Sequence, residues 1–257
     1  DEKTLDRVLK REMQAIKKEF ANPRRTQIED TVQKLTVDTR VTVADEDVIV
    51  LVSAAGYIKR SSIRSFKASE VGDNGLREDD YPLLLEQTTT LSHLYMFTNQ
   101  GRFIYRPVHE LTDARWKDTG EHLSQTIDLD DDEVIVKAML LDKLDLPGTF
   151  IFATSDGQVK QSALSDYQPG SRYKTHASVA IKLREGVQVV SVDYFEPEQA
   201  GQSALAISRE GYALRFAVED APVTGVRTAG VRAINLKEDD QLVGISLAGD
   251  GDHLGLV

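Results

Sequence analysis

The chain has 257 residues, of which 40% are hydrophobic and 28% are charged, a balance that predicts a soluble globular protein. Its formal net charge of −11 excludes a uniformly basic nucleic-acid binder, so any nucleic-acid site must be a local basic patch. The absence of cysteine excludes disulfides, thiol catalysis and cysteine-bound zinc, and no apolar run approaches the roughly 20 residues of a membrane span.

Residues 1–21 are predicted to form a helix, because apolar residues recur along one face at spacings of three and four. This stripe consists of Leu5, Val8, Leu9, Met13, Ile16 and Phe20. Asn22-Pro23 ends the helix, since the residue before a proline is pushed out of the helical region. Such a helix is marginal alone in water, so its stripe needs a partner. That partner is either the rest of this chain or the remainder of a long helical arm from an upstream part.

After residue 43 the sequence repeats four times. Each repeat has an apolar strand, a polar turn that ends in glycine, a second strand, a loop, and further strands on either side of an acidic turn. Glycine ends the first turn because it adopts positive φ without a Cβ clash. The turn glycines are Gly56, Gly101, Gly157 and Gly211. The leucines before the acidic turns are Leu76, Leu129, Leu183 and Leu236, about 53 to 54 residues apart.

This fixed period predicts an all-β, propeller-like disc of four-stranded blades. Chance similarity among β-hairpins is the alternative, and the glycine and leucine recurring in step disfavour it. The segment 27–43 is expected to cross to the first blade. The predicted blades span about 44–90, 91–143, 149–196 and 203–248, and residues 253–257 resemble the start of a further unit. A truncated sequence and a disordered tail both explain that last segment.

No constellation of residues indicates catalysis. The acidic stretch 128–133 has the carboxylates that a hard cation needs. However, other repeats carry acidic residues at the same place, which favours a solvated turn over a metal site. The histidines lack ligand spacing, and no nucleophile elbow, Walker loop or dinucleotide fingerprint is present. We therefore expect no catalytic residue, metal or cofactor in this chain. Trp116, between Arg115 and Lys117, either stacks on a base or packs in the core.

Basic residues gather in four acid-free windows, at 55–69, 100–108, 167–184 and 221–237. In a radial fold, equivalent strands share one rim, so these cations are predicted to form a discontinuous belt suited to phosphates. Ordinary alternation of surface charge is the alternative. The candidate DNA-binding residues are Lys59, Arg60, Arg64, Lys67, Arg102, Arg106, Arg172, Lys174, Arg227 and Arg232.

Two segments of the repeats, Gly56-Tyr-Ile-Lys-Arg60 and Arg227-Thr-Ala-Gly-Val-Arg-Ala-Ile-Asn-Leu236, resemble the C-terminal domain of the A subunit of bacterial type IIA topoisomerases. So does Arg24-Arg25-Thr26-Gln-Ile28, which follows a helix ending in Phe20-Ala-Asn-Pro23. No single motif is strong, but their order and spacing together are specific, and the resemblance covers nearly the whole chain.

The resemblance implies a β-pinwheel, a propeller-like disc whose blades exchange strands, preceded by an N-terminal helix. Residues 1–26 are expected to close a coiled-coil arm and lead into the disc, and residues 27–257 are expected to form the DNA-binding pinwheel. Gyrase carries a Gln-Arg-Arg-Gly-Gly-rich box in the first-blade loop. Here that loop, Ala68-Ser-Glu-Val-Gly-Asp-Asn-Gly75, has no box, which is similar to topoisomerase IV.

By this resemblance the domain binds and bends duplex DNA through phosphate contacts and presents the transported segment for ATP-dependent strand passage, decatenation and relaxation. The partners implied are double-stranded DNA and the topoisomerase IV B subunit in a heterotetramer, within a cytoplasmic, nucleoid-associated enzyme. ATP and Mg²⁺ act through other domains and through the B subunit, and the catalytic tyrosine lies upstream of this chain. The alternatives are the wrapping domain of a gyrase with a degenerate box, and a propeller-like scaffold for protein interactions.

Overall fold

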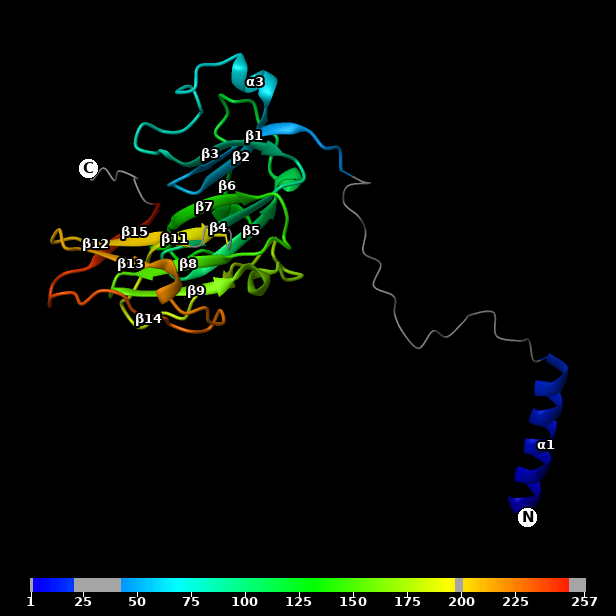
Figure 1. Ribbon diagram of the computed structural model, residues 1–257. Coiled ribbons are helices and arrows are strands. Elements are labelled where there is room, and N and C mark those ends of the chain that lie inside the picture. Colours follow the sequence, from blue (N-terminus) through cyan, green and yellow to red (C-terminus); the bar gives the residue numbers. More distant parts are fainter. Residues whose placement is uncertain (1, 21–42, 197–200, 250–257) are drawn as a thin grey trace. The chain divides into compact units, whose positions relative to one another are not determined.

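The computed structural model describes residues 2–20, 43–196 and 201–249 (Figure 1). It contains two compact units. The first is the helix α1 (Glu2–Phe20), which confirms the helix predicted from the apolar stripe. None of the described helices is both long and apolar enough to cross a membrane. The predicted segment 27–43, apart from its last residue, and the predicted further unit 253–257 lie outside the described residues.

The second unit consists of antiparallel sheets arranged side by side, which confirms the predicted all-β, propeller-like architecture (Figure 1). The first strands of the four repeats are β1 (Asp47–Ser53), β4 (His93–Thr98), β8 (Thr149–Thr154) and β12 (Ser203–Ser208). The second strands are β2 (Tyr57–Ser62), β5 (Arg102–Pro107), β9 (Gln158–Ala163) and β13 (Ala213–Ala217). The last strands are β3 (Pro82–Thr89), β7 (Ile135–Leu141), β11 (Val189–Phe195) and β15 (Leu242–Ala248).

Neighbouring blades exchange a short strand. The exchanged strands are β6 (Glu121–His122), β10 (Ser178–Val179) and β14 (Val231–Arg232). Each pairs with the second strand of the preceding blade, so that Tyr57 faces His122 in the first sheet. The sheet orders are β3-β1-β2-β6, β10-β5-β4-β7 and β11-β8-β9-β14, and the fourth sheet has the order β13-β12-β15 among the described residues. The first, second and third blades thus each hold three strands of their own repeat and one of the next.

Short helices precede the exchanged strands or follow them. The helix after the second strand is α3 (Ile63–Lys67) in the first repeat, and η1 (Val108–Glu110), η3 (Leu164–Tyr167) and η5 (Val218–Asp220) in the others. A further turn, η2 (Leu123–Gln125), follows β6. The stretches between these helices and the exchanged strands are named here the first, second and third crossover segments. They span residues 111–120, 168–177 and 221–230.

The core lies between neighbouring blades. Buried aromatic residues, including Tyr95, Phe97, Phe150 and Phe152, join the second blade to the third. Mainly aliphatic clusters fill the other two junctions. The last strands also contact one another in order, β3 with β7, β7 with β11 and β11 with β15. This side of each blade is therefore the inner edge, and the crossover segments lie at the opposite, outer edge.

The recurring turn glycines and the leucines before the acidic turns contact each other at two of the blade junctions. The four turn glycines have positive φ, between 75° and 92°, as predicted. A Cβ on Gly101 would lie 3.1 Å from Leu183, and a Cβ on Gly157 would lie 3.1 Å from Leu236. At these two junctions a leucine of one repeat packs on the turn glycine of the preceding blade, which gives a physical reason for their recurrence in step. The atoms nearest to a Cβ on Gly56 belong to His122 instead.

Candidate nucleic-acid interface

The crossover segments place one exposed cation at the same position on three successive blade junctions. These residues, named here the rim cations, are Lys117, Lys174 and Arg227. Each lies four residues before its exchanged strand, β6, β10 or β14. Because the exchanged strands align by their pairing with the preceding blade, the three positions are structurally equivalent. The outer edge of the disc therefore presents a positive charge at each described crossover.

Directly before each rim cation lies an aromatic or aliphatic residue that packs into the protein. Trp116 is fully buried, and its indole Nε1 donates a 3.1 Å hydrogen bond to the carbonyl of Glu70. Tyr173 and Val226 occupy the same position in the second and third crossover segments, and both pack on the core between the second and third blades. Trp116 is thus a packing residue and is unavailable for stacking on a base. These three side chains point into the protein, whereas the rim cations that follow them are exposed.

Two rim cations have acidic neighbours. The ammonium of Lys117 lies 2.6 Å from Asp73, and that of Lys174 lies 3.0 Å from Glu110. Hydrogen bonds to these carboxylates raise the pKa of both lysines. Arg227 makes no ion pair within the described ranges. Exposed ion pairs contribute only about 0–1 kcal/mol, so a phosphate can replace either carboxylate at little cost.

Most of the predicted DNA-binding residues are accessible. Six side chains are exposed, namely Arg64, Lys67, Arg172, Lys174, Arg227 and Arg232. Arg64 and Lys67 lie on α3 in the first blade, and the other four lie on the second and third crossover segments or on β14. Arg60 is half-buried, and its backbone pairs with the first crossover segment through Asp113. The predicted belt is therefore concentrated on the crossovers rather than on the second strands.

The prediction that Lys59 and Arg106 face DNA is corrected by their burial. Lys59 is 0% exposed and Arg106 is 7% exposed. Both lie on second strands, β2 and β5, and both point into the protein to bind backbone carbonyls. Desolvation lowers the pKa of Lys59 to about 8 and also lowers the pKa of Arg106. Neither side chain is available to a phosphate.

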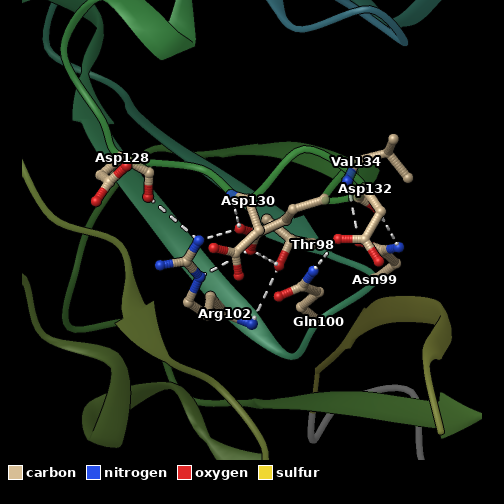
Figure 2. A network of polar contacts seen from close by, with 9 residues as sticks. Thr98, Asn99, Gln100, Arg102, Asp128, Asp130, Asp132 and Val134 are labelled. Carbon is tan, nitrogen blue, oxygen red and sulfur yellow. Dashed lines mark hydrogen bonds and ion pairs between the residues drawn. The ribbon is translucent and has the colours of Figure 1, made fainter. Parts of the chain in front are cut away.

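Arg102 is held by the acidic turn of its own blade (Figure 2). Its guanidinium donates hydrogen bonds to both carboxylate oxygens of Glu133, one of them at 2.8 Å, and to the carbonyl of Asp128. Glu133, whose side chain is fully buried, also accepts a 2.6 Å hydrogen bond from Thr98. A phosphate would have to displace a buried carboxylate to reach Arg102. Arg102 is therefore a weaker candidate than the rim cations.

The same network accounts for the acidic stretch 128–133. Asp132 accepts hydrogen bonds from the side-chain amides of Asn99 and Gln100, at 3.0 and 2.8 Å (Figure 2). Glu133 is occupied by Arg102 and Thr98. These hydrogen bonds hold the stretch 128–133 against the turn between β4 and β5. No cluster of three or more metal-binding side chains occurs in the parts of the chain that the structure describes.

Sequence reasoning did not include two exposed cations of the candidate interface, Arg115 and Lys117. Arg115 and Arg172 are equivalent, each two residues before a rim cation, and both are exposed. Lys117 and Arg115 fell outside the acid-free windows because Asp113 and Asp118 flank them. The alignment of the exchanged strands would have found them, since it matches Lys117 to Lys174 and Arg227.

Comparison with known proteins shows the same repeat. The family model described as "DNA gyrase C-terminal domain, beta-propeller" matches residues 47–69, 92–142, 149–195 and 202–248. The chain is 42% identical to the A subunit of DNA topoisomerase 4 from Streptococcus pneumoniae over 94% of its length, and 38% identical to that from Bacillus subtilis over 100%. It spans only 29% and 31% of those two relatives.

A solved structure has the same fold. The crystal structure of the C-terminal domain of DNA topoisomerase IV superimposes on the chain with a TM-score of 0.75 at 38% sequence identity. The match covers 82% of this chain and 64% of that one. The comparisons thus agree in the type of relative, and the four ranges of the family model follow the four repeats of the chain.

Proposed function

Because the chain belongs to the DNA gyrase C-terminal domain family, we propose that it is the DNA-binding C-terminal domain of a topoisomerase IV A subunit. In this proposal, duplex DNA follows the outer edge of the disc, and the rim cations contact its phosphates. The observation that carries it is the recurrence of an exposed cation at one position of three successive crossovers, Lys117, Lys174 and Arg227.

Phosphate contacts suit a protein that acts at many sequences, because they fix the path of the duplex and carry no base information. Successive blades present their cations along a curved edge, so a duplex that engages several of them bends. Bending a site of 20–30 base pairs by 40–90° costs about 1–6 kcal/mol, which several charge-assisted contacts can offset. The excess acid of the chain leaves the rest of the surface unfavourable for DNA.

In the whole enzyme, this domain would hold the segment to be transported and present it to the strand-passage gate, for decatenation and relaxation. The sites for ATP and Mg²⁺, the catalytic tyrosine and the B subunit lie outside this chain, and the assembly would act on the nucleoid. The boxless loop 68–75 favours this role over the supercoiling role of a gyrase.

The test is a titration of the chain with two duplexes of equal length and unrelated sequence, at low salt. The proposal predicts equal affinities for both, with a steep loss as salt rises. A clear preference for one duplex would indicate base readout. No binding at low salt would instead favour the protein-interaction scaffold.

A further inference from the structure

We infer that Lys59, Arg106 and Lys160 are positioning residues of the interface, each of which holds in place the crossover segment that carries one rim cation. Each buried cation belongs to one blade, and the crossover segment that it binds belongs to the next repeat. The inference deepens the proposed function and rests on it. It assigns a role to three buried cations that core packing leaves unexplained, because a buried charge is costly unless it is paired.

Lys59 in the first blade shows the arrangement most fully. Its ammonium donates 2.5 Å hydrogen bonds to the carbonyls of Trp116 and Asp118, and a 2.7 Å bond to the carbonyl of Asn74. Trp116 and Asp118 are the residues on either side of Lys117. The backbone of Lys117 is therefore fixed from both sides, while its side chain remains exposed and pairs with Asp73.

The second and third blades repeat the arrangement with different side chains. The guanidinium of Arg106 donates to the carbonyls of Tyr173 and Lys174, at 2.6 and 2.8 Å. The ammonium of Lys160 donates to the carbonyls of Gly225 and Val226, at 3.2 and 2.9 Å. In these two blades the bound carbonyls of the crossover segment belong to the rim cation or to the two residues directly before it. Arg106 also donates to the carbonyl of Tyr105 and Lys160 to that of Ala180, at 3.0 and 3.4 Å.

Strand geometry explains how lysine and arginine perform the same task. Lys59 and Lys160 lie three residues after their turn glycines, whereas Arg106 lies five residues after Gly101. Residues two apart on a strand point to the same face, so both positions look toward the crossover segment. The position of Arg106 is occupied in the third blade by Ser162, whose hydroxyl donates to the carbonyl of Thr224 in the same crossover segment.

The fourth blade provides an internal comparison. Its second strand, β13, pairs with no crossover segment among the described residues. At the two equivalent positions β13 carries Leu214 and Phe216. A buried cation therefore occurs on the second strands that receive a described crossover segment, and the equivalent positions of the strand that receives none are apolar.

Cationic side chains are suited to holding a crossover segment because each carries several hydrogen-bond donors. A crossover segment runs alongside a strand with few ladder partners, so several of its carbonyls need donors. An ammonium offers three donors at one point, and a guanidinium offers five in a fixed fork, whereas a hydroxyl offers one. One side chain can thereby bind two carbonyls of the backbone next to a rim cation.

The test is a set of double-mutant cycles on the full chain, with duplex affinity as the readout. Lys117→Ala is measured alone, with Lys59→Met and with Lys160→Met. Arg227→Ala is measured in the same three backgrounds. We expect Lys117→Ala to lose its effect on affinity when Lys59 is methionine and to keep it, within about twofold, when Lys160 is methionine. Arg227→Ala is expected to show the reverse pattern.

A role in stability alone would give additive effects in every combination, and that result would overturn the inference. Lys59→Arg is the conservative variant, and it should restore the effect of Lys117→Ala because it keeps a cation with several hydrogen-bond donors at the same position. Should Lys59→Met fail to fold, the arm with Lys160→Met and Arg227→Ala decides by itself.

Amide hydrogen exchange separates this inference from the proposed function. Lys59→Met should accelerate exchange at residues 115–119 by at least about tenfold and leave residues 225–229 unchanged. Unchanged exchange at both segments would contradict the inference even if DNA binding is normal. A wild-type chain that does not bind DNA would refute the proposed function, while the exchange measurement would still show whether Lys59 holds the first crossover segment.

Discussion

The ammonium of Lys117 on the first crossover segment lies 2.6 Å from a carboxylate oxygen of Asp73 in the first-blade loop. Two repeats thus contribute the two halves of one exposed ion pair, and the acidic half lies in the loop 68–75, which lacks a Gln-Arg-Arg-Gly-Gly-rich box. A phosphate that contacts Lys117 has to compete with Asp73. Under the proposed function, we expect the boxless loop to lower the affinity of this part of the rim for DNA.

We predict that Asp73→Asn raises the affinity for duplex DNA by about 1.5- to 5-fold, the value of one exposed ion pair. Titration at low salt measures this gain. Asp193→Asn is the matched control, because Asp193 pairs with Lys137 at 2.6 Å on the inner strands and should not affect DNA. Equal gains from both variants would mean that only total charge matters.

The loop 68–75 also leads to a prediction about DNA topology. Glu70 and Asn74 bind Trp116 and Lys59 through their carbonyls, so the loop is packed against the first crossover segment. We predict that DNA closed by ligase in the presence of this chain shows bending without a strong handed wrap. A gyrase C-terminal domain is the positive control. A robust handed change in linking number with this chain would favour the gyrase alternative.

Removal of a buried cation should cost stability at neutral pH. Lys160→Met removes the ammonium donor of the Val226 carbonyl, whereas the Gly225 carbonyl keeps its hydrogen bonds from the backbone amide and hydroxyl of Thr228. The relief of ammonium desolvation offsets part of that loss. We expect a net loss of about 1–3 kcal/mol in the free energy of unfolding, measured with denaturant. Lys143→Met, at an exposed loop position, should stay within about 0.5 kcal/mol of wild type. Equal effects of the two variants would show that the carbonyls find other partners.

The two buried lysines, Lys59 and Lys160, should make the free energy of unfolding depend on pH. Desolvation lowers the pKa of Lys59 and of Lys160 to about 8, against weaker opposing effects of Asp118 and Asp166. The unfolded chain keeps its lysines protonated to about pH 10. Between these values the unfolded state binds more protons, so these two groups make the free energy of unfolding rise with pH.

We predict that the double variant Lys59→Met/Lys160→Met shows a smaller rise in the free energy of unfolding between pH 8 and about 9.5 than wild type does. Burial raises the pKa of Tyr95, Tyr105 and Tyr167, which gives an opposite slope only above their ordinary value of 10. The chosen window therefore isolates the lysines. Parallel curves for the two proteins would contradict the assignment.

Much of the fold could be predicted from the sequence because its signals are local. A turn that needs positive φ requires glycine, as at Gly157, and the packing of Leu236 on that turn fixes the second recurring residue. The exchanged strands could not be located in the same way. β6 has only two residues, and its pairing with β2 joins positions far apart in the chain, so no periodicity reports it.

The candidate interface was harder to predict than the fold, for a physical reason. Alternation along a strand does not say which face a lysine takes, and Lys59 turns inward because three carbonyls of other segments lie there. Conversely, the search for acid-free windows excluded Lys117 because Asp113 and Asp118 flank it in the sequence. In the structure Asp118 pairs with Arg115, and Lys117 pairs with Asp73 and stays exposed. The distribution of charge in the sequence thus placed too many candidate DNA-binding residues on the second strands and too few on the first crossover segment.

The central claim is that duplex DNA follows the rim cations, and the salt dependence of binding tests it most directly. The chain is compared with a triple variant, Lys117→Ala, Lys174→Ala and Arg227→Ala. The control triple variant is Arg77→Ala, Arg184→Ala and Lys237→Ala, which removes the same charge from repeat-equivalent positions directly after the recurring leucines. The log–log slope should fall by about 0.9 per lost contact, hence by about 2.7 for the rim variant, and stay near wild type for the control. Equal slopes for the two triple variants, or a loss confined to the control, would contradict the account.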